Sequence, residues 1–386
     1  MKILSCGRWG DPCSNRFHIV IITRTKSLIK YCILFYIASL TTTAYHTRRA
    51  INWGILVLVA YLILHLSWGL FAAIWLMLFP APPTPANHAF GKLSALKFPQ
   101  STGSADLRYR LETVEGYVPP ASESAMVFFM PKNPANLLAL TNTKEFAKQV
   151  EFTDEPIEES KYLYRFVDPQ NQLRQMRYDI VSKNFIIRYL YQQDTSLFTQ
   201  RDVPLPETAL MEAQGILQNF QLYPTDIANG ATNIQYLKFS GDSLVPTTSH
   251  SQADALRIDF FRAPVAATKI FYPNPDQGPI TFIFSGSTES KKRILEFTYN
   301  YWPVDQNTTA TYTLKASTEA WAELQNQGAY IARYPKGDRK DVVIRKVYLG
   351  YYDSLESQTY LQPIFVFEGD NGFMAYVPAV APPWTE

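Results

Sequence analysis

Two histidines, His88 and His250, are the only imidazole groups beyond residue 80, and this larger part of the chain contains no cysteine. A serine hydrolase would have to recruit one of these histidines, but no Gly-x-Ser-x-Gly elbow accompanies them. The nearest phrase, residues 284–287 (FSGS), is typical of a turn. The usual zinc ligand sets are also missing, and neither phosphate-binding loop, GxxxxGK or GxGxxG, occurs. We therefore predict no catalytic, cofactor-binding or metal-binding residue and no enzymatic activity.

Carboxylates are plentiful and include the acidic run Glu151–Glu159 (EFTDEPIEE). A glycosidase needs two carboxylates held roughly 5–10 Å apart in a cleft, which the sequence alone does not place. The spacing within the run is not that of an EF-hand loop, so a weak Ca²⁺ site is only the alternative. We expect a solvated acidic loop.

Aromatic content is the most unusual feature of the composition, with 24 Tyr and 24 Phe. Exposed aromatic rings could stack on sugars or form a protein interface. Strand-rich domains, however, use Tyr and Phe mainly as cross-strand pairs and as core, which is the interpretation we favour. If an exposed aromatic patch exists, the run Tyr348–Tyr352 (YLGYY) is the first place to expect it.

The chain is organised around the segment Gly54–Phe79, which has 26 residues and contains no Asp, Glu, Lys or Arg. A hydrocarbon core of about 30 Å needs about 20 apolar residues in a helix, so this segment is long enough to span a bilayer. His65 and Ser67 are its clearly polar side chains. We expect His65 to be neutral and hydrogen-bonded rather than part of a proton relay, because relays need further ionisable groups nearby.

Charge is distributed asymmetrically about this predicted transmembrane helix. Residues 1–89 hold eight Lys/Arg and a single acid, Asp11, whereas the remainder holds 28 basic and 33 acidic residues. Positive charge before a span predicts a cytoplasmic N-terminal arm and an extracytoplasmic C-terminal region in a single-pass cell-membrane protein. The mildly acidic remainder argues against nucleic acid as a partner. Cys6, Cys13 and Cys32 all precede the span, so disulfides cannot hold the exported region together.

An alternative topology depends on Tyr31–Tyr45, which is apolar but short for a span. If this segment crossed the membrane too, a hairpin would place the large region in the cytoplasm. The pair Arg48 and Arg49 between the two segments opposes that arrangement, since it would have to be translocated.

Five segments describe the predicted organisation: a cytoplasmic basic arm (1–53), a transmembrane helix (54–79), a proline-rich linker (80–100) and two extracytoplasmic α+β domains (101–200 and 201–386). The fold class is α+β, with strands dominating. Strands are predicted where β-branched and aromatic residues alternate with polar ones: Leu107–Val114, Met126–Met130, Lys161–Val167, Arg174–Val181, Phe185–Tyr191, Ile234–Phe239, Ala255–Phe261, Thr268–Tyr272, Ile280–Ser285, Arg293–Trp302, Ala310–Leu314, Asp341–Tyr351, Ile364–Glu368 and Phe373–Val377.

Three helices interrupt these strands, at Asn136–Val150, Pro206–Phe220 and Ser317–Gln327, and each precedes a run of strands. The order suggests repeated units of a helix followed by an antiparallel meander, although no residue motif recurs. A single irregular α+β domain is the alternative. In Arg293–Trp302 the alternation places Leu295, Phe297, Tyr299 and Tyr301 on one face of a sheet.

The C-terminal stretches Tyr360–Gly369 and Phe373–Val380 form a predicted hairpin around Asp370-Asn371-Gly372. Together with residues 90–93 (FGKL) after the prolines at 80–85, this tail resembles uncharacterised single-span bacterial surface proteins with YycH/YycI-like or PepSY-like extracytoplasmic modules. The resemblance implies a helix packed on an antiparallel meander and a non-catalytic sensor, regulator or inhibitor-like role. It covers only the ends of the exported region and transfers no site residues.

These observations predict a membrane-anchored, non-enzymatic binding or regulatory protein whose partners are the lipid bilayer and another envelope protein. A carbohydrate-binding or cell-wall-acting surface protein, which would use aromatic faces and paired carboxylates, is the alternative. A passive structural surface protein is the third.

Overall fold

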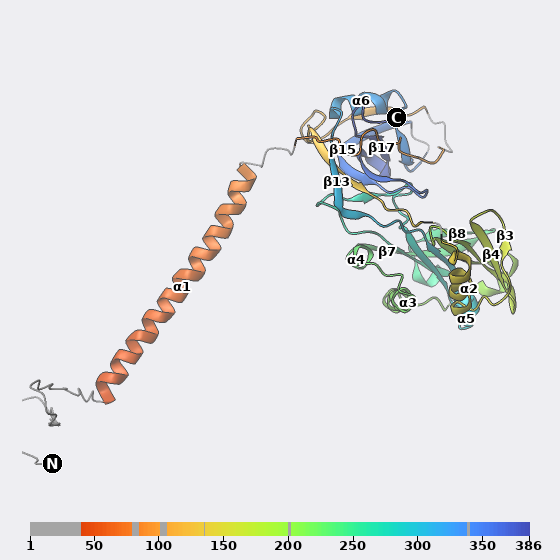
Figure 1. Ribbon diagram of the computed structural model, residues 1–386, viewed down its shortest axis with the longest axis horizontal. Coiled ribbons are helices and arrows are strands. Elements are labelled where there is room, and N and C mark those ends of the chain that lie inside the picture. Colours follow the sequence, from red (N-terminus) through yellow and green to blue (C-terminus); the bar gives the residue numbers. More distant parts are fainter. Residues whose placement is uncertain (1–39, 79–84, 101–105, 135, 200–201, 338–339) are drawn as a thin grey trace, which may run out of the picture. The chain divides into compact units, whose positions relative to one another are not determined.

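A computed structural model describes the chain except residues 1–39, 79–84, 101–105, 135, 200–201 and 338–339 (Figure 1). The chain divides into two compact units, Met1–Pro82 and Pro83–Glu386. The three cysteines, most of the predicted basic arm and the prolines at 80, 82 and 83 lie outside the described residues.

The described part of the first unit is one helix, α1 (Leu40–Leu78), of 39 residues. Its stretch Ala44–Trp75 is long and apolar enough to cross a membrane, judged by length and composition. The helix begins earlier than predicted and includes Arg48 and Arg49. Within it, the Ser67 hydroxyl donates to the Leu64 carbonyl at 2.9 Å, so this polar group is satisfied inside the helix.

The larger of two sheets in the second unit has nine strands, all in antiparallel pairs. In spatial order they are β3 (Ile157–Glu158), β4 (Leu163–Asp168), β5 (Asn171–Asp179), β6 (Phe185–Tyr189), β12 (Ile294–Tyr299), β11 (Ile280–Ser285), β9 (Ala255–Phe260), β7 (Thr232–Ser240) and β8 (Ser243–Thr247). Helices α2 (Ala139–Gln149) and α3 (Pro206–Asn219) pack on it through a core that includes Ala147, Leu217 and Phe282.

The smaller sheet has eight strands and uses residues from both ends of the unit. Its path is β1 (Arg108–Leu111), β15 (Asp341–Tyr352), β16 (Tyr360–Gly369), β17 (Met374–Pro378) and β14 (Tyr330–Arg333), to which β10 (Ile270–Phe271), β2 (Ser124–Phe129) and β13 (Asp305–Thr313) are joined. Helix α6 (Ser317–Gln325) covers it, and its Ala320 and Leu324 pack with Phe367.

Short helical segments complete the described structure. They are α4 (Thr225–Ala228), α5 (Ser290–Arg293) and the 3₁₀ segments η1 (Tyr191–Gln193), η2 (Thr195–Phe198), η3 (His250–Gln252) and η4 (Asp370–Gly372). Segment η4 closes the β16–β17 hairpin, with Asn371 and Gly372 at positive φ, so the predicted C-terminal hairpin is confirmed.

The α+β class is confirmed, and every predicted strand and helix overlaps an observed one. The short strands β3, β8 and β14 and the one-turn helices α4 and α5 were not predicted. One predicted detail is wrong: Leu295 does not share a cluster with Phe297. The β11–β12 pair changes register between Ile283 and Phe284, and Leu295 packs instead with Leu237.

The predicted division at residues 200 and 201 lies outside the described residues, but strands on its two sides pair with each other. β6 pairs with β12 in the larger sheet, and β2 pairs with β13 and β16 in the smaller one. Segments 101–200 and 201–386 therefore both contribute strands to each sheet.

Candidate functional site

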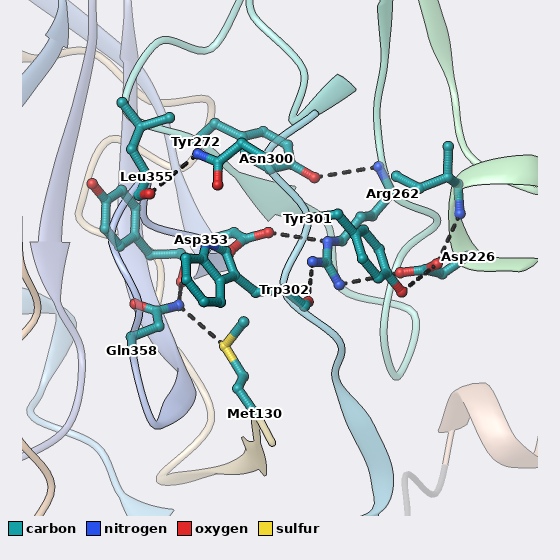
Figure 2. A network of polar contacts seen from close by, with 12 residues as sticks. Met130, Asp226, Arg262, Tyr272, Asn300, Tyr301, Trp302, Asp353, Leu355 and Gln358 are labelled. Carbon is teal, nitrogen blue, oxygen red and sulfur yellow. Dashed lines mark hydrogen bonds and ion pairs between the residues drawn. The ribbon is translucent and has the colours of Figure 1, made fainter. Parts of the chain in front are cut away.

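The buried side chain of Arg262 lies where the larger sheet meets the smaller one (Figure 2). It follows β9, and its side chain is 1% exposed. Its Nε forms an ion pair with Asp353 Oδ2 at 3.0 Å, and its Nη1 forms one with Asp226 Oδ2 at 3.1 Å. Its Nη2 donates to the Trp302 carbonyl. A buried guanidinium needs such partners, because an unpaired buried charge is very costly.

Two tyrosines complete this arrangement. The Tyr301 ring lies 4.3 Å from the Arg262 guanidinium carbon, and its hydroxyl donates to Asp226 Oδ1 at 2.9 Å. The Tyr272 hydroxyl accepts from the Arg262 backbone N–H at 3.3 Å. Burial raises the pKa of both phenols, so they stay protonated. We call Asp226, Arg262, Tyr272, Tyr301 and Asp353 the junction cluster.

The junction cluster connects elements of both sheets. Asp226 belongs to α4, Arg262 and Tyr301 follow strands β9 and β12 of the larger sheet, and Asp353 follows β15 of the smaller one. The Asp353 backbone N–H also donates to the Phe271 carbonyl at 2.9 Å. The pair between Arg262 and Asp353 is thus an ionic cross-link between the sheets.

Burial sets the electrostatics of this cross-link. It raises the pKa of Asp353 to about 6, although Arg262 opposes that shift. Burial works to lower the pKa of Arg262, but Asp353 and the neighbouring groups outweigh it and the pKa is raised. Arg262 therefore stays charged, whereas Asp353 changes its protonation within the mildly acidic range.

A cleft of about 500 Å³ lies beside the junction cluster, and we call it the polar cleft. Edge strand β14 forms one wall, and the loop Pro273–Pro279, strands β9, β11 and β12 and the segment Asp353–Leu355 after β15 also line it. Its carboxylates are held by arginines: Asp276 by Arg333 at 2.5 Å and Glu296 by Arg188 at 3.0 Å.

A buried pair supports the polar cleft from beneath. Asp259 is 1% exposed and pairs with Arg257, a lining residue, at 2.8 Å. Asp259 also accepts from the Thr281 hydroxyl at 2.7 Å. Burial raises the pKa of Asp259, and Arg257 and Thr281 oppose the shift. The donors that surround this carboxylate make it a structural anchor.

A second cleft, of about 490 Å³, shares Tyr272, Asp276 and Arg333 with the first. We call it the basic cleft. The buried side chains Phe271 and Met374 line it together with Tyr272. Its cationic lining residues are Arg262, Lys269 and Arg333, and its one carboxylate among the described residues is Asp276.

The residues first considered for catalysis lie outside both clefts. His88 stacks on Trp384 with 3.7 Å between ring centroids, and its Nε2 lies 3.2 Å from the Thr313 hydroxyl. His250 packs against Tyr236. Ser285 is buried and donates to the Lys292 carbonyl at 2.6 Å, and it is the last residue of strand β11, paired with Ala255, rather than part of the predicted turn. The structure does not bring these three residues together at either cleft.

The five acidic residues of the run Glu151–Glu159 are exposed, as expected of a solvated segment. Phe152 is buried, residues 157 and 158 form β3, and Glu159 pairs with Arg165 and Arg177 at 2.9 and 3.0 Å. The run is therefore solvated, but Phe152 anchors it and its end forms a short strand, which the expectation of a loop did not include. Among the described residues no group of three or more His, Cys, Asp or Glu is placed to hold a metal ion.

The run Tyr348–Tyr352 does not form an exposed aromatic patch. Tyr351 and Tyr352 are buried, and Tyr351 donates to the Met126 carbonyl at 2.8 Å. The favoured interpretation, that aromatic residues build the core, holds here. Arg262 and Asp353 were missed. The available signal was weak: a single charge at the end of an aromatic strand, in FFRAP and YYDS.

No protein-family model matches the chain, and no curated protein matches it. Among solved structures it is similar to an uncharacterised protein from Eubacterium rectale ATCC 33656, with 13% identity and a TM-score of 0.37. The likeness covers 67% of this chain and 84% of that one.

Proposed function

We propose that this chain is a membrane-anchored, non-enzymatic binding or regulatory protein that acts on an envelope partner. Helix α1 supports the anchor, because it is long and apolar enough to span a bilayer. Arg48 and Arg49 at its start support a cytoplasmic N-terminus with Pro83–Glu386 on the outside.

The observation that carries the non-enzymatic role is the pairing of carboxylates at the clefts. General acid–base catalysis needs a carboxyl group that can approach a substrate and exchange a proton. Asp276 and Glu296 are each held by an arginine, and Asp353 is buried against Arg262. Groups held in this way fix the shape and charge of a surface, which suits recognition.

Two concave surfaces at the junction of the sheets support a binding role, since ligand sites favour clefts between structural layers. Leu355 lines the polar cleft and is 57% exposed. It is therefore a position where a photo-cross-linking residue would meet a bound partner without disturbing the core.

The test places a photo-cross-linking amino acid at Leu355 and, as a matched control, at the exposed Leu137, which lines neither cleft. Both full-length variants are irradiated in their native membrane, and adducts are identified by mass spectrometry. A discrete adduct from position 355 that position 137 does not give supports the proposal. Identical adduct patterns from both positions, or none from either, would contradict it.

Carbohydrate binding is the second candidate, and the lining of the polar cleft favours it specifically. Tyr330 and Tyr334 line the cleft with the amides Asn274, Gln277 and Asn300. Tyrosine rings and amide groups suit sugar faces and hydroxyls. Binding to a glycan array that is lost in Tyr334→Ala and kept in Tyr117→Ala, an exposed tyrosine elsewhere, would favour this candidate.

A further inference from the structure

The basic cleft combines an apolar interior with three cationic lining residues, Arg262, Lys269 and Arg333. Phe271 is 2% exposed and Met374 is 8% exposed, and both line the cleft with Tyr272. A ligand that enters it would therefore meet side chains that favour an apolar body. The cleft volume, about 490 Å³, is within the range of small-molecule sites.

The cations around this interior differ in how far they are already neutralised. Arg262 is buried and held by Asp226 and Asp353. Arg333 is held by Asp276, whose side chain is 61% exposed, and the Arg333 Nε has no hydrogen-bond partner among the described residues. Lys269 has no carboxylate partner in the part of the chain that the structure describes, so no neighbouring negative charge compensates its ammonium group.

The charged end of Lys269 lies beside the apolar interior of the basic cleft. Its Nζ lies 5.1 Å from the centroid of the Phe271 ring, which lines the cleft. An ammonium group over an aromatic face is held there by the ring quadrupole. It can approach a carboxylate and form a charge-assisted hydrogen bond while the ligand body contacts the apolar side chains.

We propose that the basic cleft binds a small amphipathic carboxylate, with Lys269 pairing with its carboxylate and Phe271 and Met374 contacting its apolar body. This inference rests on the proposed binding role and names the ligand class for one cleft. The charge that attracts the ligand is that of Lys269, because Arg262 is already held by Asp226 and Asp353 and Arg333 by Asp276.

The test uses the full chain in lipid nanodiscs and isothermal titration with 3-phenylpropionate. The uncharged amide of 3-phenylpropionate tests whether the carboxylate is needed for binding. Hexanoate tests whether an alkyl chain can replace the aromatic ring as the apolar body of the ligand. We expect saturable binding of a carboxylate and at least tenfold weaker binding of the amide. Equal binding of acid and amide, or no saturable binding of either carboxylate, would overturn the proposal.

Single substitutions test whether Lys269 is the residue that pairs with the ligand carboxylate. Lys269→Gln should weaken carboxylate binding about tenfold, and Lys269→Arg should largely retain it. Asp276→Asn should tighten binding several-fold, because it removes the one opposing charge of the lining. Lys132→Gln, an exposed lysine that lines neither cleft, is the control and should leave binding unchanged.

These outcomes separate the inference from the proposed function. If Lys269→Gln binds as tightly as the parent chain, the assigned site is wrong even where Leu355 cross-links a partner. If carboxylate binding behaves as expected and Leu355 yields no specific adduct, the ligand site stands and the envelope-partner role falls.

Discussion

Within the junction cluster, Arg262 is the cation that Asp226 and Asp353 share. Arg262→Met would leave both carboxylates without their charge partner, at a cost of about 3–5 kcal/mol in the free energy of unfolding. Arg188→Met is the matched control, since Arg188 is 57% exposed and its pair with Glu296 contributes less than about 1 kcal/mol. Denaturant unfolding of both full-length variants checks the difference, and equal losses would contradict it.

Asp353 should behave differently from Arg262, because burial raises its pKa from 3.8 to about 6. The folded state then holds this proton more tightly than the unfolded state. Asp353 therefore makes the protein less stable as the pH rises from about 4 to about 6, and adds no further slope above that. Asp353→Asn cannot lose a proton, so it removes this part of the pH dependence.

The measurement is the difference in unfolding free energy between Asp353→Asn and the parent chain at pH 4 and pH 7. Groups common to both proteins cancel in this difference. We expect the variant to gain stability relative to the parent on going from pH 4 to pH 7. A constant difference would mean that folding does not raise the pKa of Asp353, and a change in the opposite direction would mean that folding lowers it.

Ala266 and Ala267 form a two-residue turn in which both φ values are positive, 48° and 61°. Such a turn suits Asn and Gly, because an alanine side chain at positive φ costs about 1–2 kcal/mol. Ala267→Gly should therefore stabilise the protein by about 1 kcal/mol. Ala228→Gly, an exposed change in α4, should destabilise it by about 0.5–1 kcal/mol. Thermal unfolding monitored by circular dichroism should show a higher melting temperature for Ala267→Gly and a lower one for Ala228→Gly.

At the scale of elements, Gly278 allows the loop of the polar cleft to approach β9 closely. A Cβ at this position would lie 2.2 Å from the Phe260 carbonyl oxygen, and Phe260 is fully buried. Gly278→Ala must shift backbone and should cost about 2–3 kcal/mol. Gly215→Ala in α3 meets open space, and should stabilise the protein by about 0.5–1 kcal/mol. Similar unfolding midpoints for the two variants would show that the loop adapts.

The sequence was most informative where one element's own pattern decides its structure. In β12 the alternation of Phe297 and Tyr299 with polar residues predicted a strand, and α3 was recognised by Pro206 and its apolar stripe. Edge strand β8 was missed because its five residues include Pro246, which weakens the strand signal. The register shift at Leu295 depends on the partner strand and leaves no local signature.

The candidate site could not be predicted for the same reason. Arg262, Asp226 and Asp353 belong to elements that meet only after both sheets have formed, and each is a single charge in its own segment. The clefts depend on β14, which was not predicted and which joins the smaller sheet through pairing with β17. Local patterns report burial and periodicity, whereas the site arises from contacts between sheets.

At the scale of the whole molecule, the proposed topology makes a prediction that uses the chain's own thiols. Cys6, Cys13 and Cys32 are its only cysteines, and all of them precede α1. A cysteine introduced at the exposed Lys132, which follows α1, would therefore lie on the other side of the membrane. With Arg48 and Arg49 retained on the cytoplasmic side, we expect a membrane-impermeant maleimide to label Lys132→Cys on spheroplasts. The parent chain should be labelled only after the membrane is permeabilised.

Other labelling patterns would identify other topologies directly. If position 132 is not labelled in sealed spheroplasts, Pro83–Glu386 lies in the cytoplasm and an extracytoplasmic partner is excluded. Native cysteines that are also protected would then indicate the hairpin, and native cysteines that react would indicate an inverted single span. If both react before permeabilisation, α1 does not separate them across a bilayer and the anchor itself is lost. In either case the charges of the basic cleft would still attract a carboxylate, because they depend on the folded unit and not on the side of the membrane that it occupies.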